Sequence, residues 1–281
     1  MLESVIIQTE KPIEIVIVDS SDIPLINKNK YLKICDLVFA QNIVIVYQYT
    51  KTRGAAYQRN IAMQLATGDL FHFLDDDVIL ESDYIFQMHE IFRKYPRYAG
   101  GGSAVRCAPP HITWHRILRC LFLLQRNGAS GKFTFSGMPT HAYGTNNFKD
   151  VETLGAGCMS IKAEAAREIK FDERLGTYSY MEDCDFSWRL SRKNKLFFNP
   201  KAILDHKNSR VARAKSSDMR AIYIRNYTYL FFKNFYPTNR LRILAFFWSI
   251  LGLFVEALVT RKMEWFSGYV HGLFWYWHKY P

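Results

Sequence analysis

The stretch GDLFHFLDDDVILESDYI, from Gly68 to Ile85, runs from an apolar segment into three consecutive aspartates and then into a helix-like segment. A short apolar run of this kind is typical of a buried strand. Three adjacent carboxylates repel one another unless a cation binds them. Asp75 and Asp77 can point to the same side, which predicts a site for a hard divalent cation such as Mg²⁺ or Mn²⁺. The alternative is that Asp77 only caps the next helix, and the triplet alone favours neither interpretation.

The segments before this stretch repeat the strand pattern. EIVIVD, Glu14–Asp19, is continuous and β-branched, as expected for a strand buried on both faces of a mostly parallel sheet, and QNIVIVYQY from Gln41 resembles it. AAYQRNIAMQLATGD is then predicted to form a helix that stops at Gly68. The order strand, strand, helix, strand predicts an α/β sheet whose ligands gather at the carboxyl ends of the strands. Asp19 and the aspartate triplet both lie at such ends.

Residues 100–157 are rich in Gly, Ser, Thr and Asn, and we expect them to form surface loops that shape a substrate pocket. KAEAAREI predicts a short helix after them. A second acidic cluster, YMEDCDFSWRL, places Glu182, Asp183 and Asp185 at the start of a predicted helix, where the helix dipole stabilises negative charge. Capping alone would explain these acids. Two acidic clusters together, however, suit a transfer reaction in which a metal neutralises a departing diphosphate and a carboxylate accepts a proton.

The chain carries a net charge of +11, and its basic residues concentrate just before its most hydrophobic part. From Lys207 to Arg242 there are nine basic residues and one acid, Asp218. The apolar segment Ile243–Val255 follows, too short to span a bilayer, and after it comes an aromatic stretch containing Trp265. This order favours a membrane surface over nucleic acid, and predicts a helical hairpin lying in one leaflet. Two helices that cover a hydrophobic face of the main domain are the alternative.

Cysteine content and the first residues indicate the compartment. Five cysteines without paired metal spacing argue against a disulfide framework or a zinc site. No basic segment followed by a long apolar one is found near Met1, so a signal peptide is not expected. We therefore expect a cytoplasmic protein at the inner face of the cell membrane.

Four segments carry a resemblance to a known family: EIVIVDSSD, RGAAYQRNIAMQLATGDLFHFLDDDV, GAGCMSIKAEAAREIKFDERL and YMEDCDFSWRL. In this order and spacing they resemble the family 2 glycosyltransferases, and most of all bacterial enzymes that build cell-surface polysaccharides. The resemblance implies the GT-A fold, a mixed, mostly parallel sheet with flanking helices, over residues 1–235, with a membrane-associated helical segment over 236–281. The strand that precedes EIVIVD in the family is not present, so we expect a chain truncated at its amino terminus.

The resemblance also implies roles for the residues at the donor site. Asp19 would bind the nucleotide base, with Arg53 near the base or the diphosphate. Asp75 would contact the ribose and the metal, Asp77 would be the firmest ligand of Mn²⁺ or Mg²⁺, and Asp76 belongs with the residues that bind the nucleotide sugar.

The catalytic residues implied by the resemblance lie in the second acidic cluster. Asp183 would be the general base, with Glu182 beside it in the catalytic pair. His206 stands where related enzymes often have a histidine near the metal and the diphosphate, although a lone histidine after a strand is as often structural.

These features predict an inverting, metal-dependent glycosyltransferase that moves a sugar from a nucleoside diphosphate donor to a hydroxyl of a lipid-linked or growing glycan. The donor, the acceptor and the cytoplasmic membrane surface are its expected partners, and nucleic acid is not. A nucleotidyltransferase is an alternative, but the glycine-rich, basic phosphate loop that it would need is not found. A noncatalytic remnant of the fold is a second alternative.

Overall fold

The computed structural model describes residues 1–106, 113–128, 130–176, 180–207 and 216–279. The chain forms two compact units. The first unit contains Met1–Cys107 and Tyr143–Asn208, and the second contains Ala108–Ala142 and Ser209–Pro281. This division differs from the expected boundary at residue 235, because a segment from the middle of the chain joins the carboxyl-terminal helices.

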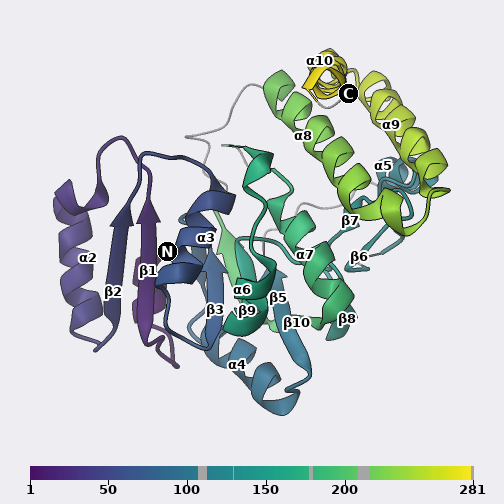
Figure 1. Ribbon diagram of the computed structural model, residues 1–281. Helices are drawn as coiled ribbons and strands as arrows, with labels where there is room; N and C mark the ends of the chain where they lie inside the picture. Colours follow the sequence, from purple (N-terminus) through teal and green to yellow (C-terminus); the bar gives the residue numbers. More distant parts are fainter. Residues whose placement is uncertain (107–112, 129, 177–179, 208–215, 280–281) are drawn as a thin grey trace. The chain divides into compact units, whose positions relative to one another are not determined.

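The first unit is a mixed α/β structure with two sheets (Figure 1). The smaller sheet pairs β1 (Glu14–Asp19) with β2 (Val44–Tyr49) in parallel. The larger sheet has the order β3-β9-β5-β10-β4, with β8 also paired to β10. Its strands are β3 (Leu70–Leu74), β4 (Val78–Leu80), β5 (Tyr98–Val105), β8 (Lys149–Val151), β9 (Cys158–Lys162) and β10 (Lys195–His206). The predicted fold class is confirmed.

Strand direction in the larger sheet follows from the pairings. β3 and β5 are each antiparallel to β9, and β5 is parallel to β10, so β3, β5 and β10 run the same way. Among the described residues β1 pairs with β2 alone and β3 with β9 alone, and no strand joins the two sheets. β1 is also less buried than predicted, since only Ile15 and Asp19 of its six residues are buried.

Helices flank these strands in the first unit. They are α1 (Leu2–Ile6), α2 (Asn29–Phe39), α3 (Ala55–Leu65), α4 (Tyr84–Lys94), α6 (Ala163–Ile169) and α7 (Glu182–Lys193). α3 ends three residues before the predicted stop at Gly68. The backbone N–H groups of Thr67 and Gly68 both donate to the Glu14 carboxylate, 2.6 and 2.9 Å away, so the chain leaves the helix early and is tied to the start of β1.

The glycine-rich segment after Arg97 does not form the predicted surface loop. It is β5, a buried strand between β9 and β10. A Cβ atom on Gly101 would lie 2.2 Å from the Phe197 ring, and one on Gly100 would lie 2.8 Å from Ile161. Glycine is therefore required because large side chains fill the space on both sides of the strand, and composition alone hides this reason.

The second unit is mainly helical. Its elements are α5 (Thr113–Leu121), the short pair β6 (Lys132–Phe133) and β7 (Pro139–Thr140), α8 (Ser216–Leu230), a π-helical turn (Phe231–Phe235), α9 (Arg242–Val259) and α10 (Met263–Lys279). α5 replaces part of the predicted loop region. Gly268 and Gly272 of α10 lie against the backbone carbonyls of Ser217 and Ala221, so α10 packs closely on α8.

Two carboxyl-terminal helices are therefore present, joined by Thr260–Lys262. α9 is 18 residues long with a mean hydropathy of 1.9, which is long and apolar enough to cross a membrane by those two measures. α9 extends past the predicted apolar segment, which ended at Val255. Glu256 does not end the helix, because its carboxylate has hydrogen-bonding partners within the protein. Arg210, Arg213 and Lys215 of the basic cluster, and the side chains of Trp275, Tyr276 and Trp277, lie outside the described residues.

Candidate functional site

The aspartate triplet occupies the turn between β3, which ends at Leu74, and β4, which begins at Val78. β4 is antiparallel to β10, and the register pairs Val78 with His206. This pairing brings the His206 Nε2 atom to 3.5 Å from Asp77 Oδ1 and 3.7 Å from Asp75 Oδ2. Residues that are distant in the sequence thus lie at one end of the sheet.

The ligand atoms of Asp75, Asp77 and His206 all lie within 4.8 Å of one another, a spacing at which one metal ion can contact all three. Two carboxylates with one imidazole suit Mn²⁺ or Mg²⁺. The capping alternative for Asp77 fails, because β4 follows the triplet and the next helix has Asp83 at its N-cap. Asp76 is exposed between the two ligand candidates, where its side chain is open to a bound molecule.

Arg59 joins the two acidic clusters, and the sequence interpretation did not include it. Its guanidinium Nη2 donates to Asp75 at 3.0 Å, and Nη1 donates to Glu182 at 2.6 Å. The same guanidinium lies 5.5 Å from the centre of the Phe171 ring. The sequence does contain a signal for this role, a single arginine within the apolar pattern of a predicted helix. A buried guanidinium requires a carboxylate partner, so such an arginine indicates a nearby acid.

Two carboxylates share this one guanidinium, and their pKa values shift in opposite directions. Burial favours a higher pKa for Asp75, but the neighbouring His206 and the charge of Arg59 outweigh it and lower the pKa. Burial raises the pKa of Glu182 to about 7, with Asp183 adding to the effect and Arg59 opposing it. Asp75 is therefore held ionised as a metal ligand requires, while Glu182 readily accepts a proton.

Asp183 lies in the first turn of α7, where helix dipoles stabilise a carboxylate. Its Oδ2 accepts a hydrogen bond from the backbone N–H of Ala156 at 3.3 Å. The next residue, Gly157, touches Asp75, since a Cβ there would lie 2.5 Å from the Asp75 carboxylate. The segment Gly155–Gly157 thus contacts Asp183 through one residue and Asp75 through the next, so the two acidic clusters lie against the same short loop.

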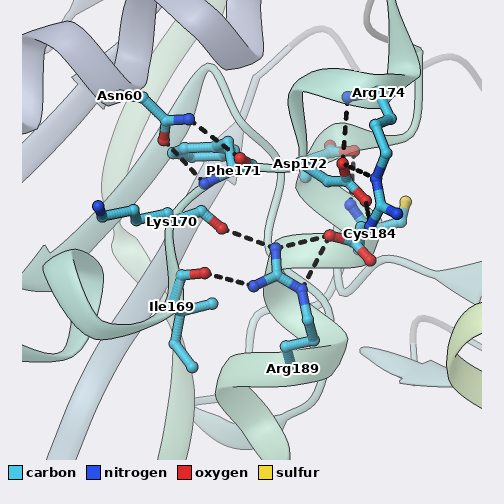
Figure 2. Close-up of polar contacts among 10 residues, drawn as sticks. Asn60, Ile169, Lys170, Phe171, Asp172, Arg174, Cys184 and Arg189 are labelled. Carbon is cyan, nitrogen blue, oxygen red and sulfur yellow. Dashed lines mark hydrogen bonds and ion pairs between the residues drawn. The ribbon is translucent and has the colours of Figure 1, made fainter.

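A second layer of contacts positions α7 and the segment before it (Figure 2). The Arg189 guanidinium donates to the carbonyls of Ile169 and Lys170 and to the Asp185 carboxylate, which is fully buried. The Asn60 side chain donates to the Phe171 carbonyl and accepts from its N–H. Asp185 is therefore committed to Arg189, whereas Asp183, which accepts from Ala156, is partly exposed.

Asp19 and Arg53 border one loop at the end of β1. The Asp19 carboxylate accepts from the N–H groups of Ser21 and Leu25, both at 2.8 Å, and from the Tyr47 hydroxyl at 2.7 Å. Arg53 pairs with Asp22 of the same loop and is largely exposed. The two predicted donor-site residues therefore lie around a common loop. Asp19 shapes that loop, and its role in binding a base stays a prediction.

Known proteins resemble this chain in sequence and in fold. Glucosyl-dolichyl phosphate glucuronosyltransferase from Haloferax volcanii is 30% identical over 105 residues, which is 37% of this chain and 32% of that protein. S. aureus TarS 1–349 in complex with UDP-GlcNAc superposes with a TM-score of 0.55 at 13% identity, covering 97% of this chain and 74% of that one. GalNAc-T7 with UDP, GalNAc and Mn²⁺ gives a TM-score of 0.52 at 14% identity, covering 78% and 41%.

The structural likeness shows the fold, and the chain spans about a third of the length of the curated relative that it matches. A family match is broader. Residues 1–169, more than half of the chain, match Glycosyl transferase family 2. This segment contains β1, the aspartate triplet and the loop that contacts Asp183. With the confirmed α/β fold, the match establishes that this chain belongs to glycosyl transferase family 2.

Proposed function

We propose that this protein is a metal-dependent, inverting glycosyltransferase that uses a nucleoside diphosphate sugar. One observation carries the proposal: the Asp75–Asp77–His206 cluster is connected through Arg59 to Glu182, the neighbour of Asp183. The connection supports a cation site and a base that act in one constellation. The UDP, UDP-GlcNAc and Mn²⁺ in the similar structures belong to those proteins, and they guide the choice of probes here.

Asp75, Asp77 and His206 would hold the metal, and the donor set fits because it combines two anionic oxygens with one nitrogen within reach of a single ion. A bound divalent cation would offset the negative charge of a diphosphate. The chain's own residues orient this cluster. Arg59 fixes one Asp75 oxygen, Gly157 leaves room for the carboxylate, and the β4–β10 register sets the position of His206.

Asp183 is the proposed base, and Glu182 is the proposed positioning residue. In one displacement the acceptor oxygen bonds to the anomeric carbon, the bond from that carbon to the diphosphate oxygen breaks, and the acceptor proton moves to Asp183. A single displacement inverts the anomeric configuration. Glu182 is 8% exposed and bonded to Arg59, which suits holding the guanidinium in place, while Asp183 is more accessible to an acceptor.

The proposed acceptor is a hydroxyl of a lipid-linked or growing glycan in cell-surface polysaccharide synthesis. The sequence resemblance supports this part of the proposal, and so does the Haloferax relative, whose name refers to a lipid-linked sugar, glucosyl-dolichyl phosphate. A noncatalytic remnant of the fold is the competing function. One observation supports this alternative: no strand of the described residues joins β1 to β3.

The test combines metal binding with turnover. Asp77→Asn replaces a charged ligand by a weaker neutral one, so we expect Mn²⁺ binding in the presence of UDP to be lost and donor hydrolysis or transfer to fall by more than about 100-fold. Glu90→Gln removes one negative charge from an exposed position on α4 and is expected to keep both properties. Circular dichroism checks that both variants are folded.

The outcomes separate the two functions. A wild-type protein that binds UDP and Mn²⁺ but neither hydrolyses nor transfers any nucleotide sugar would support the noncatalytic alternative. Full turnover of Asp77→Asn in excess chelator would remove the metal from the proposal.

A further inference from the structure

Two helices of the second unit present exposed apolar side chains in stripes. On α5, Trp114, Ile117 and Leu121 are 50%, 65% and 61% exposed, and their spacing of three and four residues places them on one side of the helix. On α9, the exposed residues include Phe247, Trp248 and Leu251, again at helical spacing. Large apolar side chains scattered singly are ordinary on a protein surface, but aligned stripes are not.

Helices α5 and α9 lie side by side (Figure 1). The Trp248 indole N–H donates to the Leu121 carbonyl at 2.9 Å, and the Phe122 and Trp248 rings lie 4.9 Å apart. Gly252 lets α9 approach, since a Cβ there would lie 2.2 Å from the Cβ of Phe122. The exposed residues at the end of α5 are therefore neighbours of those in the middle of α9, and together they form one surface, the α5–α9 surface.

The opposite side of α9 is covered by protein along the length of the helix. Near its start, Phe246 stacks on Phe231 with ring centres 4.3 Å apart, and Ser249 shares a hydrogen bond of 2.6 Å with the Tyr227 hydroxyl. Tyr227 also donates to the carbonyl of Ser136, which lies in a turn between short strands. Irregular backbone of this kind is not tolerated in contact with lipid hydrocarbon. A helix with such a neighbour along one side does not cross a bilayer alone.

The contacts of Glu256 explain why an acid is tolerated near the end of the apolar helix α9. Its carboxylate accepts two hydrogen bonds from Arg119 at 2.9 and 2.7 Å and one from His115 at 2.7 Å, both on α5. Glu256 is 2% exposed, so its charge is turned inward, away from the α5–α9 surface. The same contacts fix α5, which at 9 residues is far too short to span a bilayer, beside α9.

Basic residues border the surface. Arg116 is partly exposed beside Ile117 on α5, Arg240 is exposed just before α9, and Arg261 and Lys262 are exposed just after it. Glu264 is the acid that follows them at the start of α10. Tryptophan and cationic side chains around an apolar stripe are the composition that binds the interface of an anionic bilayer, because lipid headgroups carry the complementary charge.

We propose that the α5–α9 surface binds the face of a bilayer that contains anionic lipid, with α9 parallel to the membrane plane and one side of the helix in contact with lipid. The proposal adds a partner to the proposed transferase activity and does not depend on that activity. A second copy of this chain could bind the α5–α9 surface instead. In such a dimer the basic residues that border the surface on each copy would face one another, and their like charges would repel.

The experiment uses the full chain and vesicles of phosphatidylcholine, alone or mixed with phosphatidylglycerol. We expect the wild type to sediment with the mixed vesicles and the double variant Ile117→Asp/Phe247→Asp to bind at least about tenfold more weakly, because charged groups enter the lipid interface poorly. Phe39→Asp is the matched control, since Phe39 is 80% exposed but lies on α2 of the first unit, and it should bind like the wild type. Circular dichroism and thermal unfolding show that all three proteins are folded.

Two further measurements test the charge and the orientation. Arg116→Glu/Arg240→Glu should weaken binding to the mixed vesicles and leave binding to phosphatidylcholine unchanged. Nitroxide labels at Leu244, Leu251 and Leu258, in a cysteine-free variant that still binds vesicles, should report similar shallow depths. A label at Leu251 much deeper than the other two would show a helix that crosses the bilayer and would overturn the in-plane orientation.

Failure has a defined form. If the wild type ignores both kinds of vesicle and elutes as a dimer that Ile117→Asp/Phe247→Asp converts to a monomer, the surface binds a second copy and the membrane proposal is wrong. If the double variant binds vesicles like the wild type, a different surface is responsible. Neither result changes the outcome expected for Asp77→Asn, so the two proposals fail independently.

Discussion

Among the described residues, each unit has one buried glutamate bonded to an arginine, and the two pairs differ in what else the arginine touches. In the first unit Arg59 bonds Glu182 and also Asp75. In the second unit Arg119 gives two hydrogen bonds to Glu256, and His115 adds a third. Removing an ionised group from water is costly unless it is paired, so both pairs satisfy the same physical requirement.

The difference lies in how the charges are shared. Two carboxylates share Arg59, which couples the acidic clusters, and burial keeps the pKa of Glu182 raised although Arg59 opposes the shift. Glu256, by contrast, accepts hydrogen bonds from two donors, Arg119 and His115. These bonds satisfy its carboxylate, so the apolar helix α9 can contain an acid. In this protein the arginine that two acids share belongs to the proposed site, whereas the arginine of the fully bonded acid holds two helices together.

The largest expected effect comes from the acid next to Glu182. Asp183→Asn should lower transfer by about 10² to 10⁴-fold, the usual contribution of a general base, with UDP binding largely kept. Single-turnover kinetics with saturating donor measures the loss. Asp185→Asn should instead weaken the fold, because its partner Arg189 loses a buried carboxylate. A reversed result, with Asp183→Asn active and folded Asp185→Asn inactive, would show that the base is misassigned.

Removing the two arginines tests the comparison directly. Arg59→Met and Arg119→Met each leave a buried glutamate without its main partner, so each should lower the free energy of unfolding by about 3–5 kcal/mol. Thermal unfolding measures this cost. Only Arg59→Met should also weaken Mn²⁺ binding in the presence of UDP, because only Arg59 touches Asp75. Equal weakening by Arg119→Met would end the distinction between the two pairs.

Two glycines, one in each unit, test the same comparison through steric contacts, and the expected effects are smaller. Gly157→Ala places a Cβ against the Asp75 carboxylate, which must move, so Mn²⁺ affinity should fall by about 10-fold. Gly252→Ala places a Cβ against Phe122 and should cost about 1–3 kcal/mol of stability with Mn²⁺ affinity unchanged. Titration calorimetry and thermal unfolding on both variants separate the two effects.

The last effect depends on pH and concerns a partly buried histidine of the larger sheet. Burial, with His89 adding to it, lowers the pKa of His72 from 6.5 to about 3, and Glu10 opposes the shift. Between pH about 3 and pH 6.5 this histidine therefore binds a proton in the unfolded chain but not in the folded chain. Stability from this group is present above pH 6.5 and is lost as the pH falls from about 6.5 toward about 3, by up to about 1.4 kcal/mol per pH unit.

His72→Gln tests this assignment, because it retains a polar group beside Ser160 and His89 but does not titrate. Urea unfolding at pH 7 and pH 5 should show a smaller loss of stability for the variant than for the wild type. Identical losses in the two proteins would place the pH dependence on another group, for instance on Glu10.

Much of the first unit followed from local pattern. β1, β2, β3, α6 and α7 appear where the β-branched runs and the helical spacing predicted them. One exception is β5, because glycines are rare in strands and here leave room for Phe197 and Ile161. The site was predicted only in part for a similar reason. Acid clusters are visible as runs, whereas Arg59 acts through neighbours 16 and 123 residues away.

The second unit was the least predictable. Its helices α9 and α10 followed from composition, but α5 lies in a region that composition assigned to loops. The contacts of Glu256 with His115 and Arg119 span about 140 residues. No pattern confined to one segment contains that information, because the energy of an ion pair depends on the distance between two groups and on how much water both have lost.

By itself, the sequence determined the types of many strands and helices, the position of Asp75–Asp77 at a strand end and the concentration of positive charge before the apolar helices, since each depends on near neighbours in the chain. Tertiary structure alone decided that His206 lies 3.5 Å from Asp77, that Arg59 is shared by two acids, and that α5 lies beside α9. The reason is that side-chain chemistry is set locally, whereas distance, burial and shared partners are set by strand register and by the packing of distant segments.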